Sequence, residues 1–196
     1  MNRRLIYLVV LLLGVALLFG CGSKTDKGNQ MISPPQEQGS DGEVSTDLTS
    51  FKTTDIYGAE QTQEIFSGYD LTLVNAWGTF CKPCLNEMPD LGELKKEYES
   101  AGVNIVGIVV DVQDNDLQVI EEQRDLAQEI VKTTGADYPH LLVSMDMIQP
   151  VLSQFDAIPA SFFVDREGNI VSEFYIGSKS KDEWKSLIDE TVANQK

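Results

Sequence analysis

Two cysteines stand three positions apart, Cys81 and Cys84, within the stretch WGTFCKPC at 77–84. An apolar run typical of a strand precedes them, and an amphipathic pattern typical of a helix follows. Cys81 is therefore expected at a helix N-terminus, where free N–H groups and the helix dipole lower a thiol pKa. Lys82 adds positive charge, and Pro83 fits the first turn because its missing N–H costs little there. We expect Cys81 to be the attacking thiolate and Cys84, one turn later and more buried, to resolve the mixed disulfide.

Two other uses of such a pair fit less well. Half of a zinc site would need two further ligands, but the chain has one histidine, His140, and its third cysteine, Cys21, belongs to the N-terminal segment. A structural disulfide across so small a loop removes little entropy from the unfolded chain. The spacing therefore favours redox chemistry by a Cys81–Cys84 disulfide, with no metal and no cofactor.

The elements that must position this pair form an α/β pattern from about residue 49 onward. Short β-branched apolar runs predict strands, and apolar residues at helical spacing predict helices. The predicted strands are 71–77, 103–110, 140–144, 161–165 and 170–175, and the predicted helices are 84–100, 116–134, 151–155 and 181–192. Residues 166–169 are predicted as a hairpin turn, and 51–57 with 62–66 as a small extra hairpin. From about residue 71 onward, these predicted elements give one sheet with the order β-α-β-α-β-α-β-β-α.

With these elements in place, the chain resembles the thioredoxin superfamily through its strand, W-x-x-F-C-x-P-C, helix, and Ile158-Pro159 before a later strand. The segments Asn75-Ala76-Trp77 and Glu87-Met88-Pro89 are similar to the membrane-anchored, extracytoplasmic TlpA/ResA-type thiol-disulfide oxidoreductases, near the redoxin branch. The resemblance covers about residues 48–196 and implies a thioredoxin fold. That fold has a central mixed β-sheet flanked by helices, here with an N-terminal β-hairpin extension and an inserted helix.

The resemblance also implies a substrate-binding surface around the pair. Pro159 is expected to have a cis peptide bond and to face the disulfide, at a cost of about 0.5–1 kcal/mol for an X-Pro bond. Ile158 would offer its backbone N–H and C=O to an extended substrate segment. Trp77 and Phe80 would complete this surface, although Phe80 stands where the family usually has tryptophan.

A proton acceptor for the second thiol must come from elsewhere than Asn75, which stands where cytosolic thioredoxins carry a buried Asp. Glu87 lies three residues after Cys84 and shares its helical face. In TlpA/ResA-like proteins the acid at this position lies beside the redox pair. We therefore expect Glu87 to act with the cysteines, the alternative being a solvated helix glutamate.

The N-terminal segment is predicted to be an export signal, because the basic segment Met1–Arg4 precedes the apolar run Leu5–Gly20. This run is shorter than the roughly 18–20 residues of a bilayer-spanning helix. The sequence LFGC at 18–21 resembles a bacterial lipobox, so Cys21 is expected to be lipidated; the alternative is an uncleaved anchor. Residues 22–47 have few apolar groups and predict a disordered tether. The predicted domains are 1–20 signal peptide, 21–47 lipidated cysteine and linker, and 48–196 thioredoxin-like domain.

The charge composition limits the classes of partner that the protein is expected to bind. With 15 basic and 31 acidic residues the net charge is −16, which disfavours nucleic-acid binding. The resemblance implies a monomer, lipid-anchored to the cell membrane and facing the extracytoplasmic side. Its substrates would be disulfides of exported proteins, such as apocytochrome c or an oxidised methionine sulfoxide reductase, and a membrane thiol-reducing donor would resupply it.

Two alternatives stay open. One is a thiol peroxidase of the redoxin type, although no P-x-x-x-T/S-x-x-C setting surrounds Cys81. The other is a non-catalytic binding lipoprotein on the same scaffold. Three acids, Asp111, Asp114 and Asp116, hint at calcium but lack the EF-hand spacing; one of them is expected to cap the helix 116–134. The role of His140 stays open because the sequence names no partner for it.

Overall fold

The structure, a computed structural model, describes residues 47–195. Its centre is a five-stranded sheet in the order β5-β4-β3-β6-β7. Strands β3, β4 and β5 are parallel, whereas β6 runs antiparallel to β3 and β7 antiparallel to β6, so the sheet is mixed. The strands are β3 Leu71–Trp77, β4 Val103–Val109, β5 His140–Leu142, β6 Ala160–Val164 and β7 Tyr175–Ile176.

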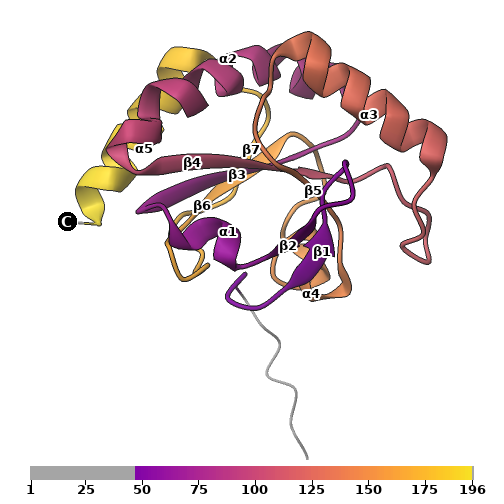
Figure 1. Cartoon of the computed structure of the whole chain (residues 1–196). Coiled ribbons are helices and arrows are strands. Elements are labelled where there is room, and N and C mark those ends of the chain that lie inside the picture. The colour runs from indigo at the N-terminus through magenta and orange to yellow at the C-terminus, as the bar shows by residue number, and fades with distance from the viewer. Residues whose placement is uncertain (1–46, 196) are drawn as a thin grey trace, which may run out of the picture. The chain divides into compact units, whose positions relative to one another are not determined.

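Helices cover both faces of this sheet (Figure 1). The long helices lie on one face: α2 Lys82–Tyr98, α3 Glu121–Thr134 and α5 Lys181–Asn194. Smaller elements lie on the other: the hairpin β1 Lys52–Thr54 and β2 Glu60–Thr62, α1 Glu64–Ser67 and α4 Met145–Ile148. The predicted thioredoxin fold, with its central mixed sheet, flanking helices, N-terminal hairpin and inserted helix α3, is confirmed.

The central strand β3 is buried on both faces and divides the core in two. Leu71, Leu73 and Trp77 pack toward the long helices, while Val74 packs with the opposite cluster. Side chains alternate along a strand, so Asn75 points to the same side as Trp77, toward α2. A polar side chain is thereby placed inside the apolar layer beneath the helix that carries the cysteines.

Several predicted boundaries are wrong, each because of a local contact. The second arm of the N-terminal hairpin, predicted at 62–66, ends at Thr62, and the chain turns into α1, which buries Phe66 against Phe51 at a ring distance of 5.9 Å. The strand predicted at 170–175 is reduced to Tyr175–Ile176 and a single bridge at Ile170. There the hydroxyl of Ser172 accepts the hydrogen bond of a β6 backbone N–H.

The inserted helix also starts later than predicted. The prediction was 116–134, but α3 begins at Glu121 after Ile120, so none of the three aspartates caps it. Asp114 instead closes a turn, its Oδ1 accepting from the backbone N–H groups of Asp116 and Gln118 at 2.9 Å each. The helix predicted at 151–155 is a 3-10 turn, Leu152–Gln154, preceded by α4. The strand predicted at 140–144 ends at Leu142.

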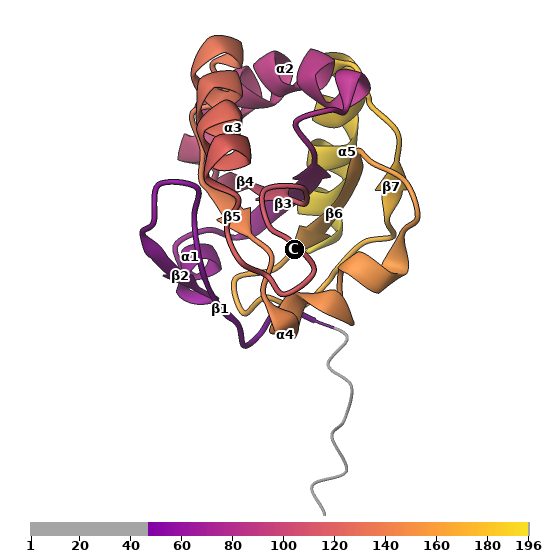
Figure 2. The same ribbon diagram turned by 90° about the vertical axis from the view of Figure 1, so that its right-hand side faces the viewer.

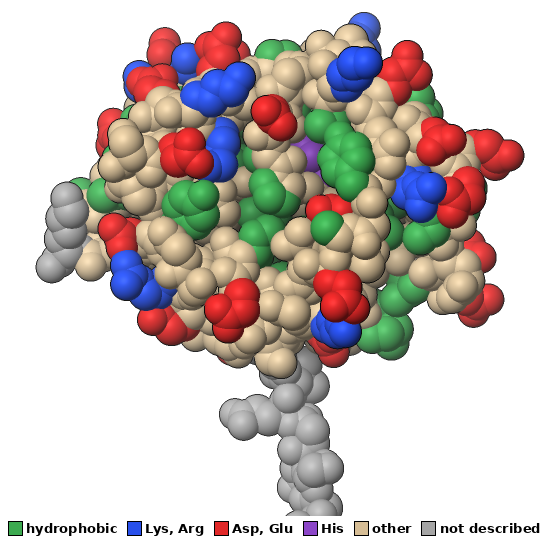
Figure 3. Space-filling model, in the orientation of Figure 1, with side chains coloured by type: hydrophobic (Ala, Val, Ile, Leu, Met, Phe, Trp, Pro, Cys, Tyr) green, Lys and Arg blue, Asp and Glu red, His purple; other side chains and the backbone are tan. Residues whose placement is uncertain are grey.

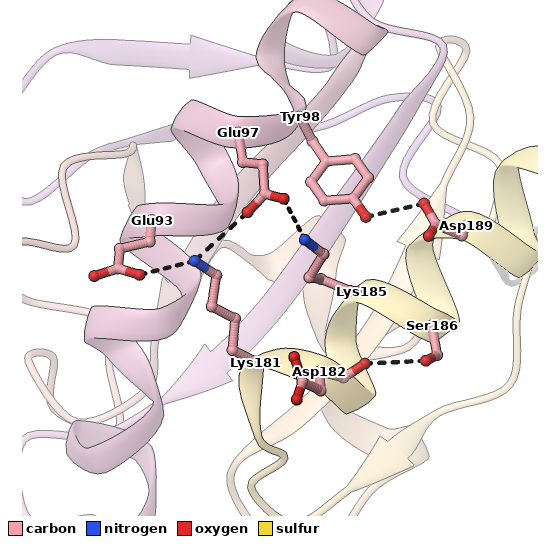
Figure 4. Close-up of polar contacts among 8 residues, drawn as sticks. All are labelled: Glu93, Glu97, Tyr98, Lys181, Asp182, Lys185, Ser186 and Asp189. Carbon is pink, nitrogen blue, oxygen red and sulfur yellow. Dashed lines mark hydrogen bonds and ion pairs between the residues drawn. The ribbon is translucent and has the colours of Figure 1, made fainter.

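The helices α2 and α5 are joined by surface ion pairs, drawn in Figure 4. Lys181 lies 2.8 Å from Glu93 and 3.5 Å from Glu97, and Lys185 also pairs with Glu97. Figure 3 shows acidic side chains, with fewer basic ones among them, mainly toward the rim of this face, and hydrophobic side chains nearer its middle. Within 47–195, no helix combines the length and the apolar character needed to cross a bilayer. The predicted signal peptide, Cys21 and most of the linker lie outside the described residues.

Candidate active site

The cysteine pair lies where β3 passes into α2, at the end of the sheet that faces the viewer in Figure 2. Cys81 and Cys84 form a disulfide, with Cα atoms 5.3 Å apart. Cys81 is the N-cap of α2, and its Sγ accepts a hydrogen bond from the backbone N–H of Cys84 at 3.3 Å. Cys81 keeps 6% of its surface exposed, whereas Cys84 keeps none. Solvent therefore reaches the pair through Cys81.

The loop before β6 borders the disulfide. The Ile158–Pro159 peptide bond is cis, as the resemblance implies. The carbonyl oxygen of Ile158 lies 3.6 Å from the Sγ of Cys81. The carbonyl of Pro159 accepts from the backbone N–H of Gly177 at 2.8 Å, which ties this loop to the segment after β7. The structure thus brings together Cys81 and Ile158, which lie 77 positions apart in the sequence.

The two aromatic residues of the motif have opposite environments. Phe80 is 74% exposed directly beside Cys81, so its ring is available to a docking protein. Trp77 is fully buried and offers no side-chain surface to a substrate. Its indole Nε1 instead donates to the Nδ1 of His140 at 3.0 Å.

His140 thereby gains the partner that the sequence did not reveal. Its Nε2 lies 3.0 Å from the carbonyl oxygen of Ala136, so this nitrogen carries the proton and the imidazole is neutral. Burial disfavours the charged ring and lowers the pKa of His140 to about 4. A Cβ at Gly107 would lie 2.3 Å from Nδ1, so glycine is needed there. A glycine inside an apolar strand was the available signal of this close approach.

Glu87 is buried beneath the same helix, with 2% of its surface exposed, and so is not a solvated residue. Its Oε1 accepts from Asn75 Nδ2 at 3.0 Å. Its Oε2 accepts from the backbone N–H of Lys179 at 3.0 Å and from Trp184 Nε1 at 3.4 Å. Burial raises the pKa of Glu87, and the three donors oppose that rise only in part. Asn75 Nδ2 also donates to the hydroxyl of Ser161 at 2.9 Å.

The sequence reasoning missed the residues that hold this carboxylate. Lys179 and Trp184 come from the other end of the chain, and no local pattern links them to α2. The Nζ of Lys179 lies 5.6 Å from the ring centres of both Tyr175 and Trp184, which fixes the loop before α5. No group of three or more potential metal-ligating side chains is found within the described residues.

The arrangement can support two-electron thiol-disulfide exchange. It combines a sulfur at a helix N-terminus, a second sulfur shielded behind it and a buried carboxylate one turn further along the helix. The first sulfur is the one that solvent and other proteins can reach. The carboxylate is an acid-base group whose proton affinity is adjusted by burial.

Comparisons with known proteins agree with this geometry. The Redoxin family model matches residues 43–188. The thiol-disulfide oxidoreductase ResA of Bacillus anthracis is 29% identical over 148 residues, covering 74% of this chain and 77% of that protein. ResA of Bacillus cereus is 28% identical and covers 95% of both chains. A solved thiol:disulfide interchange protein of the thioredoxin family from Chlorobium tepidum is 27% identical at a TM-score of 0.59, covering 72% of this chain and 92% of that one.

Proposed function

The chain belongs to the redoxin family and is a thiol-disulfide oxidoreductase with a thioredoxin-like fold, and on that premise we propose that it reduces disulfides of exported proteins through Cys81 and Cys84. The observation that carries the proposal is the asymmetry of the pair. Cys81 reaches the surface at the N-cap of α2 beside the Ile158–Pro159 loop, whereas Cys84 is fully buried. This arrangement suits an attacking and a resolving sulfur.

The proposed cycle moves two electrons from the pair to a substrate disulfide. The thiolate of reduced Cys81 attacks one substrate sulfur, and the S–S bond of the substrate breaks as the mixed disulfide forms. The released substrate sulfur takes up a proton. Cys84 then loses its proton and attacks the Sγ of Cys81, which frees the second substrate thiol and closes the Cys81–Cys84 disulfide. A dithiol donor must return two electrons to the pair before the next cycle.

Glu87 is the group that we propose as proton acceptor for Cys84. It lies one helical turn after that thiol, and its raised pKa brings its proton affinity closer to that of a thiol. Asn75 cannot take this role because an amide does not accept a proton at neutral pH. Glu87→Gln should therefore slow dithiol-disulfide turnover at neutral pH. Unchanged turnover would make Glu87 a structural residue only.

We also propose where the protein works. The signal-like segment 1–20 and Cys21 support lipid anchoring at the outer side of the cell membrane, with 21–47 as tether and 48–196 as a monomeric working domain. The proposed donor is a membrane protein of the thiol-reducing type, and the proposed substrates include apocytochrome c and oxidised repair enzymes. The Bacillus cereus relative supports a shared layout, since its alignment reaches into the N-terminal segment.

Trapping experiments test the chemistry. Cys81→Ser should abolish reduction of insulin, a model protein disulfide, while Cys84→Ser should accumulate mixed disulfides with exported proteins. The assignment of roles fails if Cys84 is alkylated faster than Cys81 at neutral pH. Consumption of hydrogen peroxide by the purified protein would instead favour a thiol peroxidase.

A membrane-fraction experiment tests the location. Cys21→Ala should leave the protein unlipidated without changing its activity toward insulin, because residues 22–47 are not expected to belong to the core. A protein that stays in the membrane fraction after this substitution would favour the uncleaved anchor. A chain starting near residue 45 that fails to fold would show that the linker is part of the domain.

A further inference from the structure

Asp111, two residues after the end of β4 at Val109, contacts the turn that leads into the cysteine pair. Its two carboxylate oxygens lie 3.0 and 2.9 Å from the backbone N of Thr79, which donates to them. The hydroxyl of Thr79 donates to Oδ2 at 2.5 Å, and Gln123 Oε1 of α3 lies 3.2 Å from the same hydroxyl. One carboxylate thus accepts from both hydrogen-bond donors of Thr79, the residue two positions before Cys81.

The turn Gly78–Cys81 is enclosed on several sides. The backbone N–H of Cys81 donates to the carbonyl of Gly78 at 3.0 Å, which closes the turn. A Cβ at Gly78 would lie 3.1 Å from Ile158 Cδ1, 3.1 Å from the Phe80 ring and 3.5 Å from Asp111 Cγ. The turn is therefore packed between the Ile158–Pro159 loop and Asp111. Asp111 is the charged member of this enclosure.

We propose that Asp111 is a positioning residue for the reaction, acting through Thr79 to hold Cys81 at the N-cap of α2 and Phe80 at the surface. We call the three hydrogen bonds between them the Asp111–Thr79 clasp. The proposal rests on the proposed function, since it takes Cys81 as the attacking sulfur. Holding the turn keeps the Cys81 sulfur within reach of the Cys84 N–H, which stabilises a thiolate at that position.

The negative charge of Asp111 and its hydrogen bonds to Thr79 are expected to have opposite effects on the reactivity of the Cys81 thiol. A negative charge near a forming thiolate disfavours it, so deleting the charge alone should make Cys81 more reactive. Deleting the clasp should free the turn and make Cys81 less reactive. The sign of the change in reactivity therefore separates the two. The chain offers a matched control in Asp114, an acid of the same loop whose carboxylate binds only backbone N–H groups of that loop among the contacts described.

The experiment measures alkylation of Cys81 by iodoacetamide at pH 7 in the reduced full chain, followed by mass spectrometry of the Cys81 peptide. Asp111→Ala and Thr79→Val should each slow it about tenfold, the factor expected from losing a charge-assisted hydrogen bond. Thr79→Ser and Asp114→Ala should stay within about twofold of the wild type because both keep the clasp. In insulin reduction, kcat should fall with Asp111→Ala and Thr79→Val, and the serine variant should restore it.

Faster alkylation of Asp111→Ala would overturn the proposal, because it would show action through charge. Unchanged alkylation in both Asp111→Ala and Thr79→Val would overturn it as well. Thr79→Val keeps the shape of the residue and the Asp111 charge, so it remains informative if Asp111→Ala fails to fold. Alkylation needs no protein substrate, so it tests the clasp independently of the proposed function. If the wild type is alkylated at Cys81 but does not reduce insulin, the proposed function is refuted, while the alkylation rates of the variants still test the clasp.

Discussion

Replacing Glu87 by alanine should cost more stability than replacing it by glutamine, and the contacts of the carboxylate give the magnitudes. Alanine removes the acceptor of three donors. These are one N–H of the buried Asn75 amide, whose Nδ2 keeps Ser161 as its other acceptor, the half-buried backbone N–H of Lys179, and the buried Trp184 Nε1. Each buried donor left unsatisfied costs about 1–3 kcal/mol. For the two buried donors, one N–H of Asn75 and Trp184 Nε1, we therefore expect Glu87→Ala to lower the free energy of unfolding by about 2–6 kcal/mol, a large part of the stability of a small domain.

Glutamine can be accommodated by a rotation of one neighbouring amide. Its Oε1 can accept from Lys179 and Trp184, while its Nε2 then faces Asn75. Asn75 Oδ1 is buried and has no hydrogen-bond partner within the described residues. If the Asn75 amide flips, this oxygen accepts from the glutamine Nε2 and from the hydroxyl of Ser161. The flip moves Asn75 Nδ2 to the position where Oδ1 had no partner, so one buried donor is left unsatisfied. Glu87→Gln should then cost about 1–3 kcal/mol, less than Glu87→Ala.

The pH dependence has a definite sign. Burial raises the pKa of Glu87 in the folded state above its ordinary value of 4.5, so the folded state binds this proton more tightly than the unfolded state. The contribution of Glu87 to stability is therefore complete below pH 4.5 and is lost as the pH rises through the folded pKa. Glutamine does not titrate, so the free energy of unfolding of Glu87→Gln should rise relative to that of the wild type between pH 4.5 and neutrality.

Urea unfolding of the oxidised proteins at pH 4.5 and pH 7.5 measures both effects. The reasoning is refuted if glutamine destabilises as much as alanine, or if Glu87→Gln and the wild type respond identically to pH.

Three further predictions use other contacts. Because burial lowers the pKa of His140 to about 4, the wild type should lose about 3 kcal/mol as the pH falls from 6.5 to 4, and His140→Gln should not show that loss in urea unfolding. Phe80→Ala should leave the melting temperature unchanged but raise KM for insulin and not for a small disulfide, since its ring is exposed. Lys181→Ala should lower the melting temperature slightly in low salt and not in 1 M NaCl, where its pairs with Glu93 and Glu97 are screened.

The sequence predicted the elements that carry the site because their signals are local. The strand 71–77 has the predicted bounds, since every residue in it is buried and most of the run is apolar. The helix predicted at 84–100 is α2, which begins two residues earlier, at Lys82, because Cys81 caps it and Pro83 fits its first turn. The predicted start of α3 is wrong, because Leu117 and Ile120 fit a helical period yet lie in a loop. Leu117 has a φ of 58°, a left-handed conformation that periodicity does not reveal.

The partners of the site residues could not be predicted, because they lie far away in the sequence. Trp77 meets His140 63 positions later, and Glu87 meets Trp184 97 positions later. The Trp77–His140 contact depends on which side of the sheet each residue faces and on the register of β3, β4 and β5. The Glu87–Trp184 contact depends on how α5 packs against α2. Register is a tertiary property that a pattern within one segment does not specify.

The choice of an amide at position 75 limits the charge beneath the cysteines. Asn75 and Glu87 approach to 3.0 Å inside a cluster that burial makes costly for any charge. A carboxylate at position 75 would place a second negative group there, and one of the two would have to be protonated. The amide instead donates to Glu87, so the cluster holds at most one charge. Two of the three donors to that charge belong to Lys179 and Trp184, so the proton affinity of Glu87 also depends on how α5 docks against α2.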